Sequence, residues 1–381
     1  MGNNRRKIKL GVIGSGFIGR VHLNQFKSIE NVELAGLTDL NSDMANKTAK
    51  EFKVQEVFES AQSMIDSPKI DALVIGVPNK HHAALAVRAL QTGKHVLLEK
   101  PMAINGLEAK QIVEAQRATG NILMIAHQMR WQWLSLHAKQ QVENGALGKI
   151  YNAKAGMWRK KAIPGWGSWF TRKSESGGGP LIDIGVHVLD LALWLLGNPR
   201  PVAVFGSTYA EFGPLKKAIG KWGTPQWGGY FDVEDLATAM IRMADGSTLT
   251  LEVSWAAHTD SDNRHFIHLM GSQGGLSLYS DRIKLTGQQF DTAFDIDVSP
   301  PTPGTATPGT AQATDCRGLL SRHFVDCINE NRQPVSDAIS GYVNNVILDA
   351  IYESAQTGKL VELDPATFEI PTAEGAANGA N

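Results

Sequence analysis

Short apolar runs alternate with longer amphipathic stretches through the first third of the chain. The strand-like runs lie at 8–14, 32–39, 71–77, 95–100 and 122–127. Helix-like stretches lie between them, among others at 79–92 and 105–119. Strands that alternate with helices predict βαβ units and a parallel sheet with helices on its faces. This pattern predicts a Rossmann-type domain over residues 1–127.

The pattern changes after about residue 128, where longer strand-like runs take over. They lie at 149–158, 201–212, 235–256 and 264–279, with helices predicted at 131–144, 318–331 and 338–357. Asp245-Gly246 separates two alternating runs, which is a strong hairpin signal, and 264–279 resembles a second hairpin. We therefore predict an α/β chain whose second domain, residues 128–365, is of the α+β class with a large, mainly antiparallel open sheet.

Two further segments have compositions typical of chain without a packed core. Residues 300–314 are rich in Pro, Thr and Gly and predict a loop. The tail, residues 366–381, ends in small and polar residues and is predicted to be disordered.

Composition and charge narrow the class of protein. The 381 residues carry 37 Lys and Arg against 38 Asp and Glu, so a nucleic-acid or membrane-surface partner is not indicated. Cys316 and Cys327 are too few for a disulfide framework. We expect no apolar run of membrane-spanning length. A reducing, cytoplasmic location is therefore predicted.

A glycine motif follows the first predicted strand and opens the first predicted helix. It consists of Gly14, Gly16 and Gly19, with Phe17 and Ile18 between the last two. Such glycines allow a tight turn and close approach of the backbone to a pyrophosphate at a helix N-terminus. Asp39 ends the next strand, where a carboxylate binds the ribose hydroxyls and repels a 2′-phosphate. We expect NAD rather than NADP; the alternative is a glycine turn with Asp39 as a cap.

A predicted helix at 180–199 is almost entirely apolar but carries Asp183 and His187, which lie one turn apart on one face. An imidazole titrates near neutral pH and suits a general base for oxidation of an alcohol, with Asp183 orienting it or binding a neighbouring hydroxyl. The alternative is a polar pair that only braces the helix. Lys100, at the end of a parallel strand, either stabilises a developing alkoxide or carries the proton itself.

Three segments carry a family resemblance. "VPNKHH" (77–82), "GKHVLLEKPMA" (93–103) and "SGGGPLIDIGVHVLDLALWLLG" (176–197) resemble the glucose–fructose oxidoreductase, inositol dehydrogenase and rhizopine catabolism (Gfo/Idh/MocA) family. The similarity continues through 323–363 and so covers nearly the whole chain. It implies a Rossmann domain, a second domain whose open sheet often forms an oligomer interface, and a nicotinamide cofactor used on a sugar or cyclitol.

The resemblance also assigns site residues. It implies that the cofactor contacts include Pro78, Asn79, His82, Glu99, Lys100 and Gln128, that Lys100, Asp183 and His187 are catalytic, and that Arg130 lines the cleft for the substrate. Many members have Trp-Arg about eight residues before the glycine run, where this chain has Trp169-Phe170, with Arg172 nearby.

Tryptophans cluster ahead of the apolar helix, within 157–170. As candidates for binding a sugar we select Trp158, Arg159, Trp166 and Trp169, because aromatic faces pack on the C–H surfaces of sugars; the alternative is that they pack the core. No histidine or cysteine cluster has metal-ligand spacing, so no metal is predicted.

The leading prediction is an NAD-dependent oxidoreductase that transfers a hydride between a sugar, glycoside or cyclitol hydroxyl and the nicotinamide. A glycosidase that uses bound NAD for transient oxidation, elimination and re-reduction is the alternative, and a sensor without catalysis is the third possibility. The expected partners are the small-molecule substrate and further copies of the chain, as a dimer or tetramer, with no nucleic acid or membrane.

Overall fold

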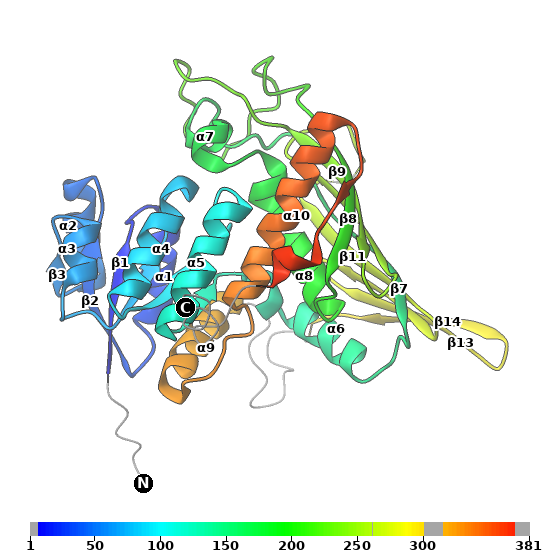
Figure 1. Cartoon of the computed structure of the whole chain (residues 1–381), viewed down its shortest axis with the longest axis horizontal. Helices are drawn as coiled ribbons and strands as arrows, with labels where there is room; N and C mark the ends of the chain where they lie inside the picture. Colours follow the sequence, from blue (N-terminus) through cyan, green and yellow to red (C-terminus); the bar gives the residue numbers. More distant parts are fainter. Residues whose placement is uncertain (1–6, 261, 301–314, 370–381) are drawn as a thin grey trace, which may run out of the picture. The chain divides into compact units, whose positions relative to one another are not determined.

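The computed structural model describes residues 7–260, 262–300 and 315–369 (Figure 1). The chain forms two compact units. Of the described residues, one unit comprises 7–128, 317–342 and 369, and the other comprises 129–260, 262–300, 315–316 and 343–368. The predicted loop lies outside the described residues from 301 to 314, as does the tail from 370 onwards. The first residues of that tail form a short 3₁₀ helix, η5 (Pro365–Phe368).

A six-stranded sheet, all of whose pairs are parallel, forms the core of the first unit. Its strand order is β3-β2-β1-β4-β5-β6. The strands are β1 (Ile8–Ile13), β2 (Val32–Thr38), β3 (Glu56–Val57), β4 (Ala72–Ile75), β5 (His95–Leu98) and β6 (Leu123–Ile125). The five predicted strands are confirmed, whereas β3 was not anticipated because two residues carry no periodicity.

Helices connect these strands and bury both faces of the sheet (Figure 1). They are α1 (Phe17–Phe26), α2 (Ser42–Phe52), α3 (Ala61–Asp66), η1 (Asn79–His81), α4 (His82–Gln91) and α5 (Gly106–Thr119). The strand order reverses between β1 and β4, which is where ligands bind in open α/β sheets. The segments that follow β1, β4 and β5 therefore share one edge of the sheet, and they carry the glycine motif, Asn79 and Lys100.

A segment from late in the chain completes the first unit. The helix α9 (Cys316–Glu330) places Phe324 edge-on against Phe26. The backbone of Ser336 accepts a hydrogen bond from Ile125 of β6, and the Ser336 hydroxyl donates to the Ile125 carbonyl. Residues 317–342 thus join the Rossmann unit, whereas the sequence division assigned them to the second domain.

A nine-stranded sheet dominates the second unit, in the order β14-β13-β12-β11-β7-β10-β9-β8-β15. Its strands are β7 (Ile150–Trp158), β8 (Pro201–Tyr209), β9 (Leu236–Met243), β10 (Thr248–Ser254), β11 (Arg264–Gly271), β12 (Gly274–Tyr279), β13 (Ile283–Gln289), β14 (Thr292–Val298) and β15 (Val361–Glu362). Among these nine described strands only β7 and β10 pair in parallel, so the mainly antiparallel sheet is confirmed. Both predicted hairpins are present, as β9–β10 and β11–β12.

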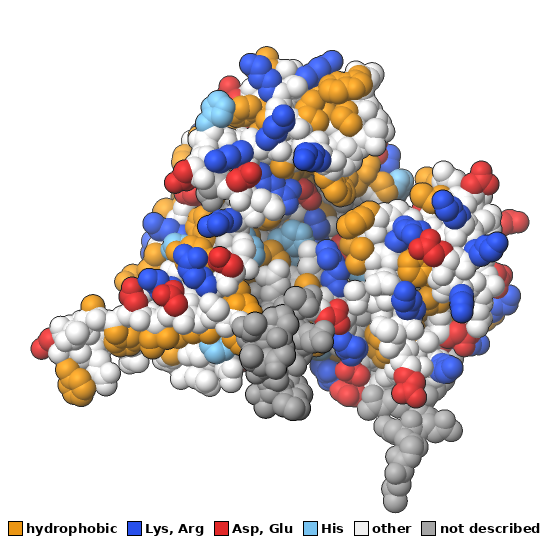
Figure 2. Space-filling model, turned by 180° about the vertical axis from the view of Figure 1, so that it is seen from behind, with side chains coloured by type: hydrophobic (Ala, Val, Ile, Leu, Met, Phe, Trp, Pro, Cys, Tyr) orange, Lys and Arg blue, Asp and Glu red, His pale blue; other side chains and the backbone are white. Residues whose placement is uncertain are grey.

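Helices cover one face of this large sheet (Figure 1). The helical segments of this unit are η2 (Gln128–Trp131), α6 (Trp133–Glu143), η3 (Trp169–Thr171), α7 (Lys173–Ser176), a π-helical turn η4 (Leu181–Gly185), α8 (Val186–Leu195) and, from residue 343 on, α10 (Ala338–Thr357). Helix α8 packs on β7 and β11. The β13–β14 hairpin was not anticipated, and its exposed apolar side chains form a band along the projecting hairpin in Figure 2.

One expectation about apolar runs is wrong. The helical stretch Lys173–Leu195 has 23 residues, and an 18-residue window within it has a mean hydropathy of 1.4, so its length and composition would allow it to cross a membrane. However, 89% of its apolar window is buried inside the protein. Packing in the core of the second unit therefore accounts for its apolar character.

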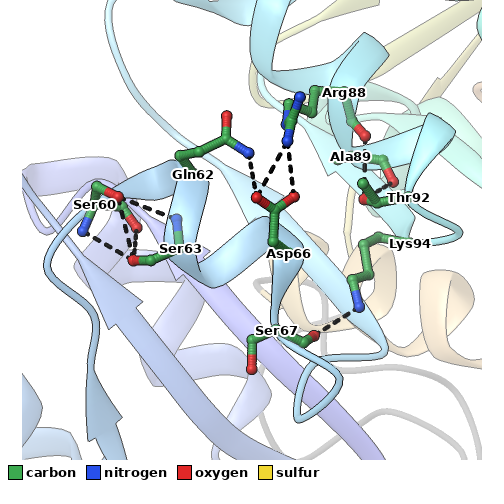
Figure 3. Close-up of polar contacts among 9 residues, drawn as sticks. All are labelled: Ser60, Gln62, Ser63, Asp66, Ser67, Arg88, Ala89, Thr92 and Lys94. Carbon is green, nitrogen blue, oxygen red and sulfur yellow. Dashed lines mark hydrogen bonds and ion pairs between the residues drawn. The ribbon is translucent and has the colours of Figure 1, made fainter.

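Polar contacts fasten α3 and the following loop to α4 (Figure 3). Asp66 accepts hydrogen bonds from Gln62 and from Arg88, and these side chains are largely exposed. Exposed pairs of this kind contribute little stability. Lys94 is more buried, and it donates to the carbonyl oxygens of Ser67 and Ile70 at 2.8 and 2.7 Å. These contacts set the loop that leads into β4.

Candidate active site

The glycine loop between β1 and α1 fits the approach of a phosphate group. Gly14 has a φ of +100°, and a Cβ there would overlap the backbone of Gly76. A Cβ on Gly19 would overlap the carbonyl of Gly14, so the helix packs tightly against the loop. By contrast, nothing lies within 4 Å of the position of a Cβ on Gly16. The loop is thus closed underneath and open at Gly16, where a pyrophosphate needs room.

Helix α1 begins at this open position without a side-chain cap. Gly16 occupies the N-cap, and no acidic residue lies in the first turn. The backbone N–H groups at the start of the helix can therefore point to an anion. Phe17 is exposed and Ile18 half-buried beside them. The residues present fit the pyrophosphate of a dinucleotide.

Asp39 follows β2 and binds the glycine loop directly. Its Oδ2 accepts hydrogen bonds from the backbone N–H and the hydroxyl of Ser15, at 2.7 and 2.9 Å, and its Oδ1 accepts one from the N–H of Asn41. A carboxylate has about four acceptor sites, so one remains for a ribose hydroxyl. The two interpretations considered for Asp39, cap and ribose ligand, are compatible in this geometry.

Glu99 forms a buried ion pair with His22 of α1. His22 Nε2 lies 2.7 Å from Glu99 Oε1, and both side chains are more than nine-tenths buried. Burial raises the pKa of the Glu99 carboxyl, but the hydrogen bond and charge of His22, together with Lys100, outweigh it and hold that pKa below its usual value. The carboxylate therefore stays charged and faces α1, which makes Glu99 a support for Lys100 rather than the open cofactor contact expected.

His82 also differs from its expected role. Its side chain is buried, with Nδ1 2.8 Å from the carbonyl oxygen of Pro101 and Nε2 2.9 Å from that of Val77. Burial lowers the pKa of this imidazole despite the two carbonyls. Each ring nitrogen faces a backbone carbonyl, and the neutral ring donates its single N–H to one of them, so His82 joins the loops after β4 and β5. Pro78 remains half-buried on the same loop, and Asn79 is buried.

Asp183 and His187 are exceptional in their stretch of helix. Every residue from 178 to 195 is buried except these two, which are half-buried. Asp183 lies in the π-helical turn η4, directly before α8, and π turns occur frequently at functional sites. Its Oδ2 accepts a hydrogen bond of 3.0 Å from the indole N–H of Trp255, which is fully buried. The helix thus presents one carboxylate and one imidazole at an otherwise apolar surface.

Arg130 does not have the open position expected of a substrate ligand. Its side chain is 1% exposed and forms two hydrogen bonds with Asp190, at 2.7 and 2.6 Å. Asn344 donates a third hydrogen bond to the same carboxylate at 3.0 Å. Paired charges and satisfied oxygens are what burial requires. Arg130 therefore anchors α8 through Asp190, while Gln128, two residues earlier, is half-buried.

The tryptophan segment divides into packed and accessible members. Trp166 is buried and donates its indole N–H to the carbonyl of Gly213, so the expectation of a substrate contact there is replaced by a packing role. Trp169 stays half-buried against Phe170. Trp158 and Arg159 are half-buried, and Arg159 Nε bonds to Asn263 at 3.2 Å.

Sequence reasoning missed three residues that support the site. They are His22, Glu234 and Trp255, each of which contacts a candidate residue or its helix from more than 50 positions away. Only His22 had a local signal, since it lies three residues beyond Gly19. Among residues 7–260, 262–300 and 315–369, no three His, Cys, Asp or Glu side chains form a group that would hold a metal ion.

Both halves of the chain match known family models. Residues 8–127 match the oxidoreductase family with an NAD-binding Rossmann fold, and residues 135–277 match the GFO/IDH/MocA C-terminal domain. Among curated proteins, the chain is 29% identical over 360 residues to D-glucoside 3-dehydrogenase of Escherichia coli K12, covering 93% of this chain and 97% of that protein. It is 26% identical to myo-inositol 2-dehydrogenase of Thermotoga maritima, covering 74% and 80%.

Solved structures show the same architecture. Levoglucosan dehydrogenase in complex with NADH and levoglucosan superposes with a TM-score of 0.82 at 26% identity, covering 94% of this chain and 99% of that one. The NADH complex of the same enzyme gives a TM-score of 0.83 at 25% identity, covering 94% and 100%. The predicted fold and cofactor class are thereby confirmed.

Proposed function

The chain belongs to the Gfo/Idh/MocA family of oxidoreductases, and we propose that it oxidises a secondary hydroxyl of a sugar, glycoside or cyclitol with NAD⁺. The observation that carries this proposal is the burial pattern of residues 178–195, where only Asp183 and His187 emerge. The relatives named as glucoside, inositol and levoglucosan dehydrogenases support the substrate class. A dinucleotide site at the glycine loop supplies the other half of the reaction.

The proposed chemistry divides between a hydride and a proton. Bound at the glycine loop, NAD⁺ would supply the acceptor for the hydride that leaves the carbinol carbon. The hydroxyl proton passes to His187, whose side chain is half-buried; an imidazole is the side-chain type best suited to accept a proton near neutral pH. Asp183, held by Trp255, binds an adjacent hydroxyl or orients the imidazole. Lys100, half-buried after β5, stabilises the developing alkoxide.

Substitution of Lys100 tests this assignment together with a substrate screen. Purified enzyme is incubated with NAD⁺ and monosaccharides, inositols and glycosides, and both NADH absorbance and released aglycone are followed. Wild type is expected to produce NADH without aglycone. Lys100→Ala is expected to lower kcat by about a thousandfold, as loss of one charge-stabilising group does, with NAD binding within about threefold. Aglycone release without NADH accumulation would refute the dehydrogenase.

We also propose that the nine-stranded sheet joins copies of the chain. Phe205 of β8 and Met240 of β9 are cross-strand neighbours on the face away from the helices, and they are 47% and 56% exposed. Tyr151 of β7 is 55% exposed. Apolar side chains gathered on an open sheet are typical of oligomer interfaces. Sedimentation velocity of wild type and Met240→Glu tests this: a wild-type oligomer that the substitution dissociates supports it, and a monomeric wild type contradicts it.

A further inference from the structure

The glycine run before the apolar helix makes room for two side chains from distant parts of the second unit. A Cβ on Gly178 would overlap the hydroxyl of Tyr352 on α10. A Cβ on Gly179 would overlap the backbone carbonyl of Glu234, with the Glu234 carboxylate only 3.1 Å away. The run is therefore more than a flexible turn: it lets a carboxylate and a phenol reach the start of the helix.

The Glu234 carboxylate is fully engaged at that position. It accepts hydrogen bonds of 3.0 Å from the backbone N–H groups of Gly179 and Leu181 and from the Tyr352 hydroxyl. Pro180, between the two backbone donors, has no N–H to offer. A carboxylate at a helix N-terminus both satisfies these donors and complements the helix dipole.

The Glu234 side chain is buried. Burial raises the pKa of the carboxyl, while the N–H groups of Gly179 and Leu181 and the phenol oppose that rise. Burial also raises the pKa of Tyr352 well above its usual value, and the negative charge of Glu234 raises it further. The phenol therefore keeps its proton and donates a hydrogen bond to the Glu234 carboxylate. Lys173 lies over the ring of Tyr352, with Nζ 5.2 Å from the centroid. Glu234 and Tyr352 therefore contact each other, and Glu234 also binds the backbone at the start of the helix.

The π turn that carries Asp183 begins at Leu181, one of the residues held by Glu234. Trp255 holds the side chain of Asp183 within the same turn, and its own backbone N–H donates to the carbonyl of Asp235, next to Glu234. The segment 234–235 therefore supports the turn from two directions. A π turn is intrinsically less favourable than α-helix, so its position depends on such external contacts.

We propose that Glu234, together with Tyr352, is a positioning residue that fixes the π turn and thereby sets the orientation of Asp183 and His187 toward the substrate. Glu234 itself touches neither substrate nor cofactor in this scheme. The inference rests on the proposed function for its kinetic consequence, but the ordering of the turn by Glu234 is independent of any activity.

Two separate substitutions test the contacts of Glu234, one at the carboxylate and one at the Tyr352 hydroxyl. Glu234→Gln keeps the volume but turns an amide N–H₂ toward backbone donors, whereas Tyr352→Phe removes only the hydroxyl and keeps the ring under Lys173. Displacement of catalytic groups by about 1 Å costs on the order of a hundredfold in rate. We expect kcat to fall about thirty- to a hundredfold for Glu234→Gln and about three- to tenfold for Tyr352→Phe. The dissociation constant of NAD is expected to stay within about twofold.

Asp235 provides a matched control, because it is adjacent and also buried. It accepts two backbone hydrogen bonds, from Phe212 and Gly213, at 2.6 and 2.9 Å, but these lie in a loop and not in the helix. Asp235→Asn is expected to lower the unfolding temperature about as much as Glu234→Gln does. Its kcat is expected to stay within about threefold of wild type.

Hydrogen–deuterium exchange of the peptide spanning residues 177–190 gives a readout that needs no substrate. Faster exchange in that peptide for Glu234→Gln, but not for Asp235→Asn, supports the positioning role. Unchanged exchange overturns it, as does an equal loss of kcat in both variants. If wild type oxidises no sugar, glycoside or cyclitol, the proposed function fails while the exchange result still decides the role of Glu234.

Discussion

The imidazole of His22 and the carboxylate of Glu99 lie 2.7 Å apart in the interior of the Rossmann unit. His22 is on α1, whose first turn is open to the pyrophosphate, and Glu99 directly precedes Lys100. The pair therefore links the cofactor helix to the candidate catalytic lysine. Removing one partner of a buried ion pair leaves an uncompensated charge, which typically costs about 3–5 kcal/mol.

The first prediction concerns this pair. Glu99→Leu and His22→Phe, each alone, are expected to lower the free energy of unfolding by about 3 kcal/mol, because a buried group loses its partner. The double variant is expected to lose less than the sum of the two. Urea denaturation of all four proteins measures the coupling; additive losses would show that the two side chains do not interact.

Asp39 is predicted to set the choice between NAD and NADP. Asp39→Ala removes the charge that repels a 2′-phosphate and also removes the acceptor that holds Ser15 of the glycine loop. Loss of charge-assisted hydrogen bonds costs roughly 1.5–3 kcal/mol, so we expect about ten- to a hundredfold weaker NAD binding and a higher NADP/NAD ratio. Calorimetric titration with both dinucleotides measures this. Asp39→Asn is the control that removes the charge and keeps an acceptor; an unchanged ratio in both variants contradicts the assignment.

Trp255→Phe is predicted to impair catalysis through Asp183. The substitution keeps an aromatic ring in the core and removes the N–H that holds Asp183. We expect kcat to fall about tenfold, consistent with one lost hydrogen bond to a charged group, and the pH profile of kcat to shift because the neighbouring imidazole is less well oriented. Trp194→Phe, a buried indole on α8, is the control; a matching shift there would indicate a general loss of packing.

A fourth prediction concerns stability at acid pH. His323 lies on α9. Burial lowers the pKa of its imidazole from 6.5 to about 4, and burial lowers the pKa of His265 from 6.5 to about 4 as well. The neutral His323 ring accepts a hydrogen bond from the N–H of Val335 at 3.0 Å. The unfolded chain takes up protons below pH 6.5 whereas the folded protein does so near pH 4, so stability should be lost as pH falls through that window.

His323→Gln keeps an acceptor that does not titrate. Its free energy of unfolding is therefore expected to depend less on pH between 6.5 and 4 than that of wild type. Urea denaturation at several pH values in this window measures the difference. Parallel pH dependence of the two proteins would show that His323 titrates at its ordinary pKa.

Local patterns in the sequence determined the Rossmann unit and much of its cofactor site. The signals are local, within a βαβ unit of about 30 residues: they are the strand and helix periodicities and the spacing of Gly14, Gly16 and Gly19. The strand at 32–39 places Asp39 beside these glycines. The turn at Asp245-Gly246 is local in the same way. The family motifs identified Lys100, Asp183 and His187 as candidates, although they could not tell how each is supported.

Only the tertiary structure decided which polar side chains support the site and which are packed. Arg130 and Asp190 lie 60 positions apart, Asp183 and Trp255 lie 72 apart, and Gly179 and Glu234 lie 55 apart. Contacts of this range leave no periodic trace, because their geometry depends on how whole strands and helices pack. The same reason explains why Trp166 proved to be a packing residue, and why the glycine run is now understood as space for Glu234 and Tyr352.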